Sequence, residues 1–402
     1  MESVIVIGGG ASGILAALTA AEKPGRRVLL LERQQRIGRK LLATGNGRCN
    51  LTNTGASGAH YHGENPAFAL PALERFGPAQ ALDFFHGLGL LTQEEHGGRV
   101  YPLSNSANSV LDVLRFALDK AGVEQCCSCP VKAVRREKQG FTVETESEKL
   151  HADKLILACG GAAGAKLGGV SDGYLLAKSL GHKRTGLYPA LVQLTTDPEY
   201  PRALKGVRVV CSLRLKRRAF LLAKAAGELQ FTETGVSGPA VFDLSRAAAT
   251  GGEGLSLHIA LLPQSERELT ELLRRRREAY PGLPASELLT GMLHNRLGRM
   301  LVKYAGLPGE RPMGQLGDED LAALARACGD FCLAVTGTEG FDCAQVTAGG
   351  LRSSDFDPRT LESRLVPGLF ACGELLDIDG DCGGYNLQWA WASGRLAGRL
   401  GA

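Results

Sequence analysis

Residues Val4–Glu32 read VIVIGGGASGILAALTAAEKPGRRVLLLE, and this stretch decides the fold. The apolar run Val4–Ile7 predicts a buried strand, and the Ala- and Leu-rich segment after the glycines predicts a helix that begins near Ala11 and Ser12. A second apolar run then ends at Glu32. The order of strand, glycine turn, helix and strand is typical of a dinucleotide-binding βαβ unit.

Glycines occupy all three positions of the G-x-G-x-x-G pattern, at Gly8, Gly10 and Gly13. We expect Gly8 to permit a tight turn, Gly10 to let the backbone approach a pyrophosphate, and Gly13 to let the helix pack closely on the strand. The helix would direct free N–H groups and its positive dipole end at the phosphates. Glu32 lies about 20 residues further on, where an acid hydrogen-bonds an adenosine ribose.

Composition places the chain among ordinary globular proteins. Its 402 residues are enough for about two or three domains, with 44% hydrophobic and 22% charged residues. The net charge of +4 is too small to indicate nucleic-acid binding by itself. We expect a cytoplasmic protein, because the first predicted strand begins without a signal peptide, no apolar run approaches a transmembrane length of roughly 18 residues, and the cysteines are scattered.

A polar, glycine-rich segment follows between residues 33 and 58. Loops of this composition after a nucleotide-binding unit are usually functional, although a solvated linker is the alternative. Backbone N–H groups and cations here would bind phosphates, and the candidates are Arg33, Arg39, Lys40, Gly47 and Arg48. A second glycine cluster contains Gly160 and Gly161, where backbone could also press on a ligand. The C-x-x-C at residues 126–129 lacks a second pair or a nearby His, so we expect no metal site.

The middle of the chain changes character twice. Strand-like segments between residues 190 and 262 are often broken by Pro and Gly, which favours an antiparallel barrel or sandwich. Residues 264–328 have helical periodicity, and Ser265 with Glu268 predicts a capping box. The basic run Arg274–Arg277 has acids at i,i+4 spacing, so we expect a solvated helix face rather than a nucleic-acid patch.

The C-terminal block repeats the logic of the N-terminus. Pro367–Cys372 predicts a short buried strand, Gly380–Asn386 a tight loop, and Leu387–Leu400 a helix whose N-terminus faces a ligand. We therefore expect the first and last segments of the chain to share one domain.

These blocks together resemble the BaiN-like family of FAD-dependent oxidoreductases, which includes proteins called aminoacetone oxidases. The family belongs to the glutathione-reductase-like class of flavoproteins with two dinucleotide folds. The resemblance covers almost the whole chain and rests on Gly8–Gly13, Gly38–Asn53, Gly98–Pro102, Thr232–Pro239, Val346–Gly350 and Pro367–Gln388. Thr44, where Ser often precedes the glycine, and the variable pair Asp381-Cys382 are small departures from the pattern.

The resemblance implies an α/β fold in which a Rossmann-like FAD-binding domain is split by an inserted antiparallel β-barrel and a small helical subdomain. The implied boundaries are 1–189 and 347–402 for the FAD-binding domain, 190–263 for the barrel with return strands at 329–346, and 264–328 for the helical subdomain. Residues 190–328 show the same order in their own periodicity.

The resemblance also implies non-covalent FAD binding. Gly373 and Glu374 would lie along the ribitol and pyrophosphate, and Val131 would offer its backbone to the adenine. A helix N-terminus at the flavin would stabilise negative charge on the reduced ring. The remaining implied cofactor residues are Asn50, Asp377, Gly384, Tyr385, Asn386 and Leu387. The backbone of residues 384–387 would meet the pyrimidine edge of the flavin ring.

The same class includes disulfide reductases, which have C-x-x-x-x-C just after the first acid. Only Cys49 occupies that region here, and disulfide exchange needs two thiols, so we exclude that reaction. We expect Cys49 to be a packed thiol, with a catalytic thiol as the alternative. A second G-x-G-x-x-G unit for NAD(P)H is missing, although a nicotinamide could still dock transiently against the flavin.

We predict an NAD(P)H-linked reductase of a small organic substrate. The alternative is an oxidase that uses O2 on a small amine, and two other classes are an RNA-modifying flavoprotein and a non-enzymatic FAD-binding protein. Small molecules are the expected partners, without nucleic acid or membrane. Arg99 is the best candidate to hold a carbonyl or carboxylate, because its planar fork binds such groups bidentately. The other substrate-side candidates are Tyr101, Thr232, Ser237 and Tyr385.

Overall fold

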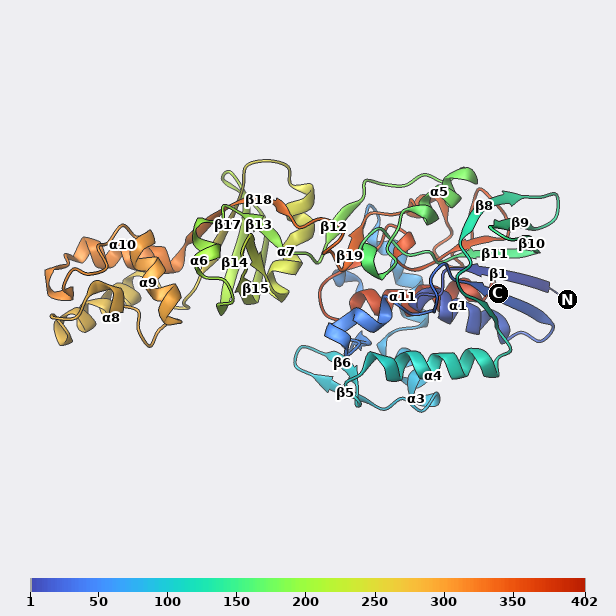
Figure 1. The fold of residues 1–402 in the computed structure, drawn as a ribbon, viewed down its shortest axis with the longest axis horizontal. Helices are drawn as coiled ribbons and strands as arrows, with labels where there is room; N and C mark the ends of the chain where they lie inside the picture. Colours follow the sequence, from blue (N-terminus) through green and yellow to red (C-terminus); the bar gives the residue numbers. More distant parts are fainter. Residues whose placement is uncertain (1, 402) are drawn as a thin grey trace. The chain divides into compact units, whose positions relative to one another are not determined.

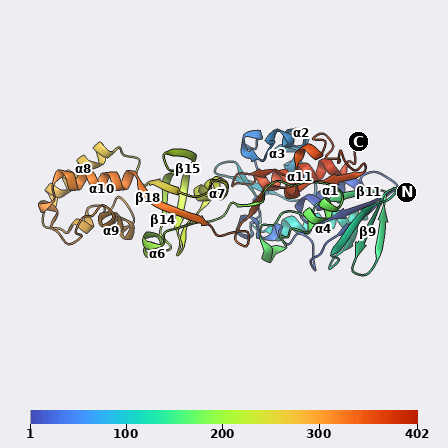
Figure 2. The ribbon, with the colours of Figure 1, turned by 90° about the horizontal axis from the view of Figure 1, so that it is seen from above.

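The structure, a computed structural model, describes residues 2–401. The contacts divide the chain into two compact units, which we describe separately (Figures 1 and 2). The first unit contains the residues up to Pro189 and those from Ala344 onward, and the second contains Ala190–Cys343. An α/β unit split by an inserted barrel unit confirms the predicted fold class.

A parallel five-stranded sheet forms the centre of the first unit. Its order is β20 (Leu369–Ala371), β11 (Lys154–Leu157), β1 (Glu2–Ile7), β2 (Arg26–Leu31) and β7 (Glu124–Cys126). Strands from both ends of the chain are therefore neighbours, because β20 pairs with β11 in parallel. The strands are apolar runs because both faces of such a sheet are covered.

Two helices from opposite ends of the chain, α1 (Ala11–Ala21) and α11 (Tyr385–Gly398), lie side by side on this sheet (Figure 1). Their backbones approach closely at glycine. A Cβ at Gly394 would lie 2.3 Å from the Ser12 carbonyl oxygen, and one at Gly398 would lie 2.5 Å from that of Ala16. The predicted sharing of one domain by the first and last segments thus depends on a glycine-mediated helix contact.

Smaller elements surround this core. The bounds of the strands are β8 Val131–Arg136, β9 Phe141–Thr145 and β10 Lys149–Ala152 in one sheet, β3 Thr52–Asn53, β6 Arg99–Pro102 and β5 Thr92–Glu95 in a second, and β21 Asp379–Gly380 with β4 Tyr61–His62 in a third. The helices are α2 Leu70–Arg75, α3 Pro78–Gly87, α4 Ala107–Lys120 and α5 Asp172–Ser179.

A closed six-stranded antiparallel barrel forms one part of the second unit. Around the barrel the order is β13 (Leu194–Thr196), β16 (Gly235–Ser237), β15 (Phe220–Phe231), β14 (Arg208–Arg217), β17 (Leu255–Ala260) and β18 (Phe331–Thr338). In β17 every second residue is buried, which is the alternation expected of a sheet with one solvated face.

The barrel differs from the sequence prediction at β15. The sequence pattern alone predicts a strand over Ala219–Leu222, but β15 continues to Phe231, because pairing with β14 keeps an Ala- and Gly-rich stretch extended. The Gly-, Thr- and Ser-rich segment Phe231–Pro239 suggests a lid or contact loop, whereas its residues form β16 and the start of α7 (Pro239–Thr250), a helix that the sequence did not predict. The turn before it needs glycine, since Gly238 has a φ of +112° and a Cβ there would lie 2.6 Å from the Glu228 carbonyl oxygen.

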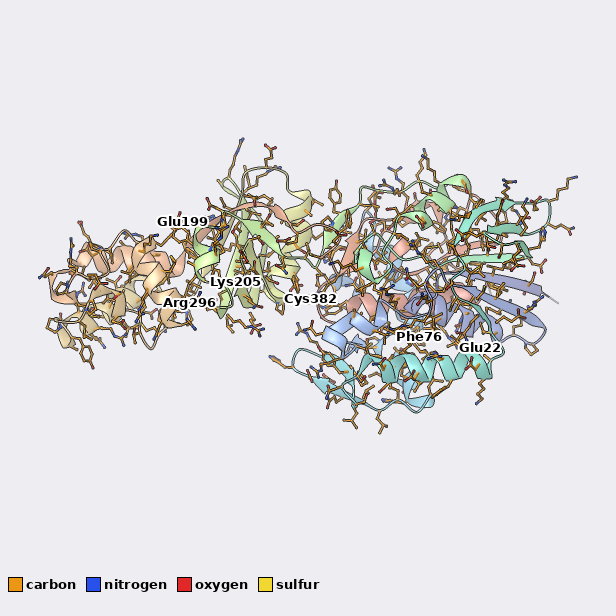
Figure 3. The ribbon with its side chains drawn as sticks, in the orientation of Figure 1. Glu22, Phe76, Glu199, Lys205, Arg296 and Cys382 are labelled. Atoms are coloured by element: carbon orange, nitrogen blue, oxygen red, sulfur yellow. The ribbon has the colours of Figure 1, made fainter. Side chains whose placement is uncertain are left out.

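The second unit also contains a helical part. Its helices are α6 (Glu199–Ala203), α8 (Glu266–Ala279), α9 (Asn295–Tyr304) and α10 (Asp318–Gly329). The capping box is present, since Glu268 N donates to Ser265 Oγ at 3.3 Å and Ser265 N donates to Glu268 Oε2 at 2.9 Å. Arg296 of α9 donates to the carbonyl oxygens of Ala203 and Lys205 and so ties α9 to the end of α6 (Figure 3).

Three of the four arginines in the basic run of α8 pair with carboxylates, and Arg276 donates to backbone carbonyl oxygens. Arg274 pairs with Glu271 at 2.5 Å and with Asp318 of α10 at 3.1 Å, and Arg275 pairs with Glu271 at 3.2 Å. Arg277 pairs with Asp318 at 3.0 Å. These cations therefore stabilise the helix packing and present little net charge. Within residues 2–401, no helix has both the length and the apolar character needed to cross a membrane.

Candidate cofactor and active site

The first glycine turn has the geometry that its pattern predicts. Gly8 has a φ of +112°, and a Cβ there would lie 2.3 Å from the Ala158 carbonyl oxygen. A Cβ at Gly13 would lie 1.8 Å from the Gly8 carbonyl oxygen, so neither position can accept a side chain. A Cβ at Gly10, by contrast, would meet nothing within 4 Å, so the space in front of the first turn of α1 is open.

Three backbone N–H groups face this open space. Ile14 N donates to Gly10 O at 2.9 Å and makes the first intrahelical bond of α1, so the N–H groups of Ala11, Ser12 and Gly13 precede it. Such a terminus favours an anion through both its donors and its dipole. The arrangement can hold a pyrophosphate.

Glu32 stands at the end of β2 next to this turn. Its Oε2 accepts the Gly9 N–H at 2.8 Å, and its Oε1 accepts the Gln34 N–H at 2.7 Å. A carboxylate has about four acceptor positions, so both oxygens keep capacity for ribose hydroxyls. The two backbone bonds fix the carboxylate in place before any ligand arrives.

Lys40 and Glu374, 334 residues apart in the chain, meet at 2.7 Å. Glu374 also accepts the Thr347 N–H at 2.9 Å, and the Thr347 hydroxyl accepts the Ala163 N–H at 2.9 Å. A Cβ at Gly161 would lie 2.4 Å from the Thr347 hydroxyl oxygen. The structure thus brings together four predicted segments, and Thr347 is a contributor that the sequence reasoning did not single out.

The other predicted cations point to different partners. Arg33 pairs with Asp172 at 3.1 Å, and Arg39 donates to the Gln34 side chain at 2.6 Å. Arg48 pairs with Glu95, donates through Nε to Asn105 at 2.9 Å, and lies 4.0 Å above the Tyr101 ring. Lys40 is therefore the predicted cation that directly contacts another predicted cofactor residue.

The loop that carries Arg48 is wound tightly. Gly45, Asn46, Gly47 and Cys49 all have φ between +56° and +84°. Cys49 is fully buried, and its burial raises the pKa of the thiol to about 12, although a hydrogen bond with Thr44 lowers it in part. This is the environment of a packed thiol, since a nucleophilic cysteine needs a lowered pKa.

A second helix N-terminus lies beside this loop. Gly384, at φ +102°, precedes α11, and a Cβ there would lie 2.5 Å from the Thr52 carbonyl oxygen. Gln388 N makes the first intrahelical bond to Gly384 O at 3.0 Å, so the N–H groups of Tyr385, Asn386 and Leu387 precede it. The Asn386 side chain bonds both backbone groups of Gly380, which fixes the loop before the helix.

Asn50 provides a test of whether this site fits a flavin. Its Oδ1 is buried and has no hydrogen-bond partner within residues 2–401. It lies next to the α11 terminus, since a Cβ at Gly384 would be 2.9 Å away. A buried acceptor without a donor is costly, and the N–H of a flavin pyrimidine edge would supply the missing donor. The residues present therefore fit FAD.

The structure also shows the hydrogen bonds or open space around the other predicted cofactor residues. Asp377 is 2% exposed and its Oδ2 accepts the Glu64 N–H at 3.0 Å, so it fixes the chain that enters β4. Gly373 N donates to the Ser393 hydroxyl at 2.9 Å. A Cβ at Gly160 would meet nothing within 4 Å, as at Gly10. Val131 begins β8 and lines an open groove between β8 and α5.

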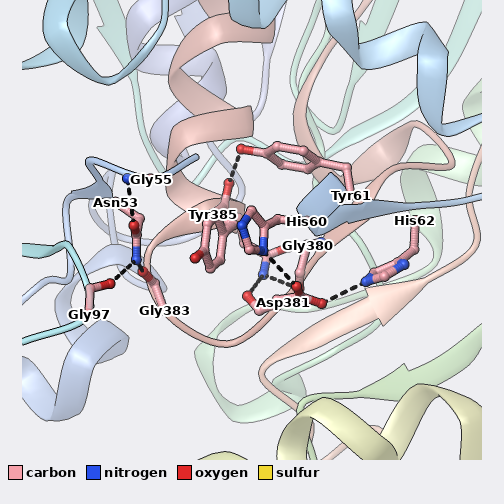
Figure 4. Close-up of polar contacts among 11 residues, drawn as sticks. Asn53, Gly55, His60, Tyr61, His62, Gly97, Gly380, Asp381, Gly383 and Tyr385 are labelled. Atoms are coloured by element: carbon pink, nitrogen blue, oxygen red, sulfur yellow. Dashed lines mark hydrogen bonds and ion pairs between the residues drawn. The ribbon is translucent and has the colours of Figure 1, made fainter. Parts of the chain in front are cut away.

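A polar cluster of histidine, aspartate and tyrosine side chains lies at the start of α11 (Figure 4). Asp381 binds His60 Nδ1 at 2.9 Å and His62 Nε2 at 2.7 Å. The His60 ring stacks on the Tyr385 ring with 4.3 Å between centroids, and the Tyr61 hydroxyl donates to the Tyr385 carbonyl oxygen at 3.1 Å. Burial raises the pKa of the Asp381 carboxyl, but the hydrogen bonds from His62 and His60 outweigh it, so the pKa lies below its usual value.

Little in the sequence indicates this cluster. Neither histidine belongs to a recognised motif, and Asp381 was noted only as part of a variable pair. Pairing of β4 with β21 brings them together from segments more than 300 residues apart. His62 lies in β4, and His60 ends the helical turn just before it, so no strand pattern in the sequence relates the two side chains.

Arg99 and Tyr101 of β6 reach the same loop from another direction. A Cβ at Gly383 would lie 3.4 Å from Arg99 Nε, and Asn53 fastens this loop by donating to the Gly383 carbonyl oxygen at 2.9 Å. Arg99 has no ion pair within 4.0 Å among the described residues 2–401. Burial raises the pKa of the Tyr101 hydroxyl, while the charges of Arg99 and Arg48 lower it. The structure thus brings Arg99, Tyr101 and Tyr385 into one region.

Two substrate-side candidates belong to the second unit. The Thr232 hydroxyl oxygen is buried and has no hydrogen-bond partner in the described part of the chain. Ser237 ends β16 and is paired with Gln230 of β15. Both are therefore part of the barrel wall or its immediate connection, and their predicted contact with a substrate stays a prediction.

Comparisons with known proteins find relatives along the whole chain. Residues 2–400 match the family described as "HI0933-like protein Rossmann domain". The chain is 41% identical to the 3-dehydro-bile acid delta(4,6)-reductase of Clostridium scindens, over 100% of this chain and 99% of that protein. It is 33% identical to the ribosomal RNA dihydrouridine synthase of Escherichia coli, over 97% and 95%.

Among solved structures, the 3-ketosteroid delta1-dehydrogenase of Sterolibacterium denitrificans matches with a TM-score of 0.52 and 15% identity, over 99% of both chains. This likeness concerns the fold. The whole-length family match confirms the family and the enzyme class that the motifs predicted. The chain belongs to the HI0933-like family, and it is an FAD-dependent oxidoreductase.

Proposed function

We propose that the protein is an NAD(P)H-linked reductase that reduces a carbon–carbon double bond conjugated with a carbonyl group in a small organic molecule. The observation that carries the proposal is the 41% identity, over the whole chain, to a reductase of 3-dehydro-bile acids. The name of that relative describes double bonds conjugated with a ketone. Dihydrouridine formation in the more distant relatives likewise reduces a double bond next to a carbonyl.

This reaction adds a hydride to one carbon of the double bond and a proton to the other, while the electrons come from NAD(P)H. When bound, FAD supplies the hydride transfer. The N-terminus of α11 would stabilise the negative charge that builds up on the reduced ring. Glu32, the α1 terminus and the Lys40–Glu374 pair would bind and orient the rest of the cofactor.

Arg99 and Tyr101 have the chemistry that the substrate needs. Arg99 has no ion-pair partner in the described residues 2–401, so its guanidinium can hold the carbonyl oxygen and stabilise the charge that develops there. The Tyr101 hydroxyl keeps its proton at neutral pH, as its ordinary pKa of about 10 already ensures, and it lies two residues from Arg99 on β6, so we propose it as the proton donor. The His60–Asp381–His62 cluster holds the loop against which Arg99 packs.

Anaerobic reduction of the flavin tests the proposal. We expect NADH or NADPH to bleach the purified holoenzyme, and a steroid with a 3-oxo-4-ene group to restore the oxidised spectrum without oxygen. Bleaching by a small amine, with rapid recovery in air and production of hydrogen peroxide, would instead establish the oxidase alternative. A bound flavin that no donor reduces would indicate a non-enzymatic role.

Reduction of uridine in ribosomal RNA is the second candidate. Identities of 33% and 30% to two ribosomal RNA dihydrouridine synthases, each over 97% of this chain, favour it. Incubation of the holoenzyme with a ribosomal RNA transcript and NADPH, followed by mass spectrometry of the nucleosides, distinguishes the two candidates. Dihydrouridine with no turnover of conjugated ketones would replace the small-molecule proposal.

A further inference from the structure

The hairpin of β14 and β15 in the second unit concentrates positive charge. Residues 208–231 contain a single acid, Glu228, and six cations: Arg208, Arg214, Lys216, Arg217, Arg218 and Lys224. The formal charge of this segment is +5, six cations less one acid, whereas the whole chain carries +4. The charge of the protein is therefore unevenly distributed, and a surface of this kind attracts polyanions.

Strand alternation and pairing place four of these cations on the outer face of the barrel: Arg208, Arg214, Lys216 and Lys224. Along β14, Cys211, Leu213 and Leu215 are buried while Arg214 is exposed. The register places Arg214 directly opposite Lys224 of β15. Like charges at such a position destabilise a sheet, so this pair does not serve the stability of the hairpin.

Neutralisation of the hairpin is incomplete. Arg208 pairs with Glu228 at 3.6 Å, and Arg214 pairs with Asp330 at 3.0 Å. The remaining four cations have no carboxylate within 4.0 Å in the described residues 2–401; these are Lys216, Arg217, Arg218 and Lys224. The basic run on α8 is the opposite case, because acids from α8 and α10 pair with it.

Apolar side chains accompany the cations at the end of the hairpin. Phe220 is 73% exposed and stands opposite Arg217, and Leu221 is 55% exposed. Aromatic side chains on a sheet face stack with unpaired bases, and cations beside them follow the phosphates. Barrel surfaces of this kind are frequent oligonucleotide-binding sites.

We propose that the exposed end of the β14–β15 hairpin binds single-stranded RNA, with Phe220 stacking on a base and Arg218 and Lys224 contacting phosphates. The inference does not depend on which double bond the enzyme reduces. An anionic membrane is the less favoured partner, because the cations extend along both strands beyond the short apolar tip. RNA is the nucleic acid named in the function of two relatives.

Fluorescence anisotropy of the holoenzyme with a fluorescein-labelled 20-nucleotide oligouridylate tests the proposal. The hairpin variant combines Lys224→Glu with Arg218→Asp, since Asp tolerates the φ of +55° at position 218. Each lost phosphate contact lowers affinity about fivefold at 0.1 M salt, so we expect a loss of about 25-fold and a shallower salt dependence. Phe220→Ala should weaken binding at least about fivefold without changing the salt dependence.

The matched control is Arg267→Glu combined with Arg275→Glu on α8, which removes the same number of exposed cations. We expect its affinity for RNA to stay within about twofold of the wild type, because the hairpin is intact. Equal losses in the two double variants, or no binding by the wild type at 0.05 M salt, would overturn the proposal.

Flotation with phosphatidylglycerol-containing vesicles tests whether the hairpin binds an anionic membrane instead. Loss of vesicle binding in the hairpin variant, with unchanged RNA affinity, would also overturn the proposal. Flavin reduction by NAD(P)H, measured on the same variants, should equal that of the wild type. The outcome for the hairpin is thus separate from the outcome for the proposed reductase activity.

Discussion

The cofactor site of the first unit and the β14–β15 hairpin of the second unit are assembled in opposite ways. The cofactor site consists of short, contiguous segments, such as Gly8–Gly13, whose local turns aim backbone donors at a ligand. The hairpin surface consists of scattered cations that become one surface only when β14 pairs with β15. Arg274–Arg277 shows the converse, a basic run that is obvious in the sequence but in which three of the four arginines pair with acids of α8 and α10.

The difference teaches where sequence patterns report function directly. A sequence motif predicts a binding site when a contiguous segment forms that site. A cluster of charged residues predicts one only when the residues packed around it are also known. The predictions below test this distinction, since changes in the first unit should act on flavin and folding, and changes in the hairpin should leave the flavin untouched.

The largest effect is expected for Gly13→Ala compared with Gly10→Ala. A Cβ at position 13 would lie 1.8 Å from the Gly8 carbonyl oxygen, so α1 must move away from β1 at a cost of about 3 kcal/mol or more. A Cβ at position 10 meets only open space, so that variant should fold normally but bind FAD more weakly. Urea denaturation and flavin titration measure the two effects, and equal loss of stability in both variants would contradict the assignment.

We expect the second-largest effect for Glu32→Ala, on the affinity for FAD. The carboxylate would lose its bond to ribose, which contributes about 1.5–3 kcal/mol, so FAD affinity should fall by about 10- to 100-fold. The apoprotein should stay folded because Glu32 is only partly buried, although the N–H of the buried Gly9 loses its acceptor. An unchanged dissociation constant in flavin fluorescence titrations would show that Glu32 does not bind the ribose.

Arg99→Lys separates a substrate-binding role from a structural one. It keeps the charge but loses the planar fork, so turnover should fall at least about tenfold, equivalent to about 1.4 kcal/mol. Flavin content and melting temperature should stay near those of the wild type, since Arg99 has no ion pair among residues 2–401. A protein that unfolds but keeps its specific activity would make Arg99 structural.

Much of the first unit follows from the sequence because its signals are local. The order of β1, glycine turn, α1 and β2, and the final strand, loop and α11, could be predicted from periodicity and glycine spacing alone. Residues that act through distant pairing could not. Thr347 reaches Glu374 and Ala163 through the tertiary fold, and His60 meets Asp381 only because β4 pairs with β21.

The second unit was predicted less completely for the same reason. β14 and β17 alternate clearly, whereas the Ala-rich half of β15 is extended only because β14 pairs with it. Leucine spacing predicts a helix through Leu289, Leu293, Leu297 and Leu301, but α9 begins only at Asn295, because His294 caps it by accepting the Arg296 N–H. Spacing of leucines alone did not reveal this local start signal.

Asp381→Asn should have a smaller, pH-dependent effect. The pKa of the carboxyl is lower in the folded protein than its usual value of about 3.9, so its stabilising effect is present above that pH and is lost as the pH falls through the folded value. We expect the free energy of unfolding to fall by about 1 kcal/mol at pH 7, a small value because the cluster is partly exposed. At pH 3 the difference from the wild type should be smaller. Equal losses at both pH values, measured by urea denaturation, would exclude an ionic role for Asp381.

The smallest effect, and the one most specific to the hairpin, is expected for the single variant Lys224→Glu. It turns a cross-strand pair of like charges with Arg214 into a pair of opposite charges, so the free energy of unfolding should rise by about 0.2–1 kcal/mol at low salt. The gain should shrink in 1 M salt, where the Debye length falls to about 3 Å. Lys216→Glu removes the same charge opposite Leu221 and is the control that should bring no comparable gain. A stability gain together with weaker RNA binding would mean that the cation at position 224 is costly for folding and useful for recognition. A loss of stability in Lys224→Glu would instead show that Lys224 stabilises the barrel. The hairpin cations could then not be contrasted with the cofactor site as residues that do not serve stability.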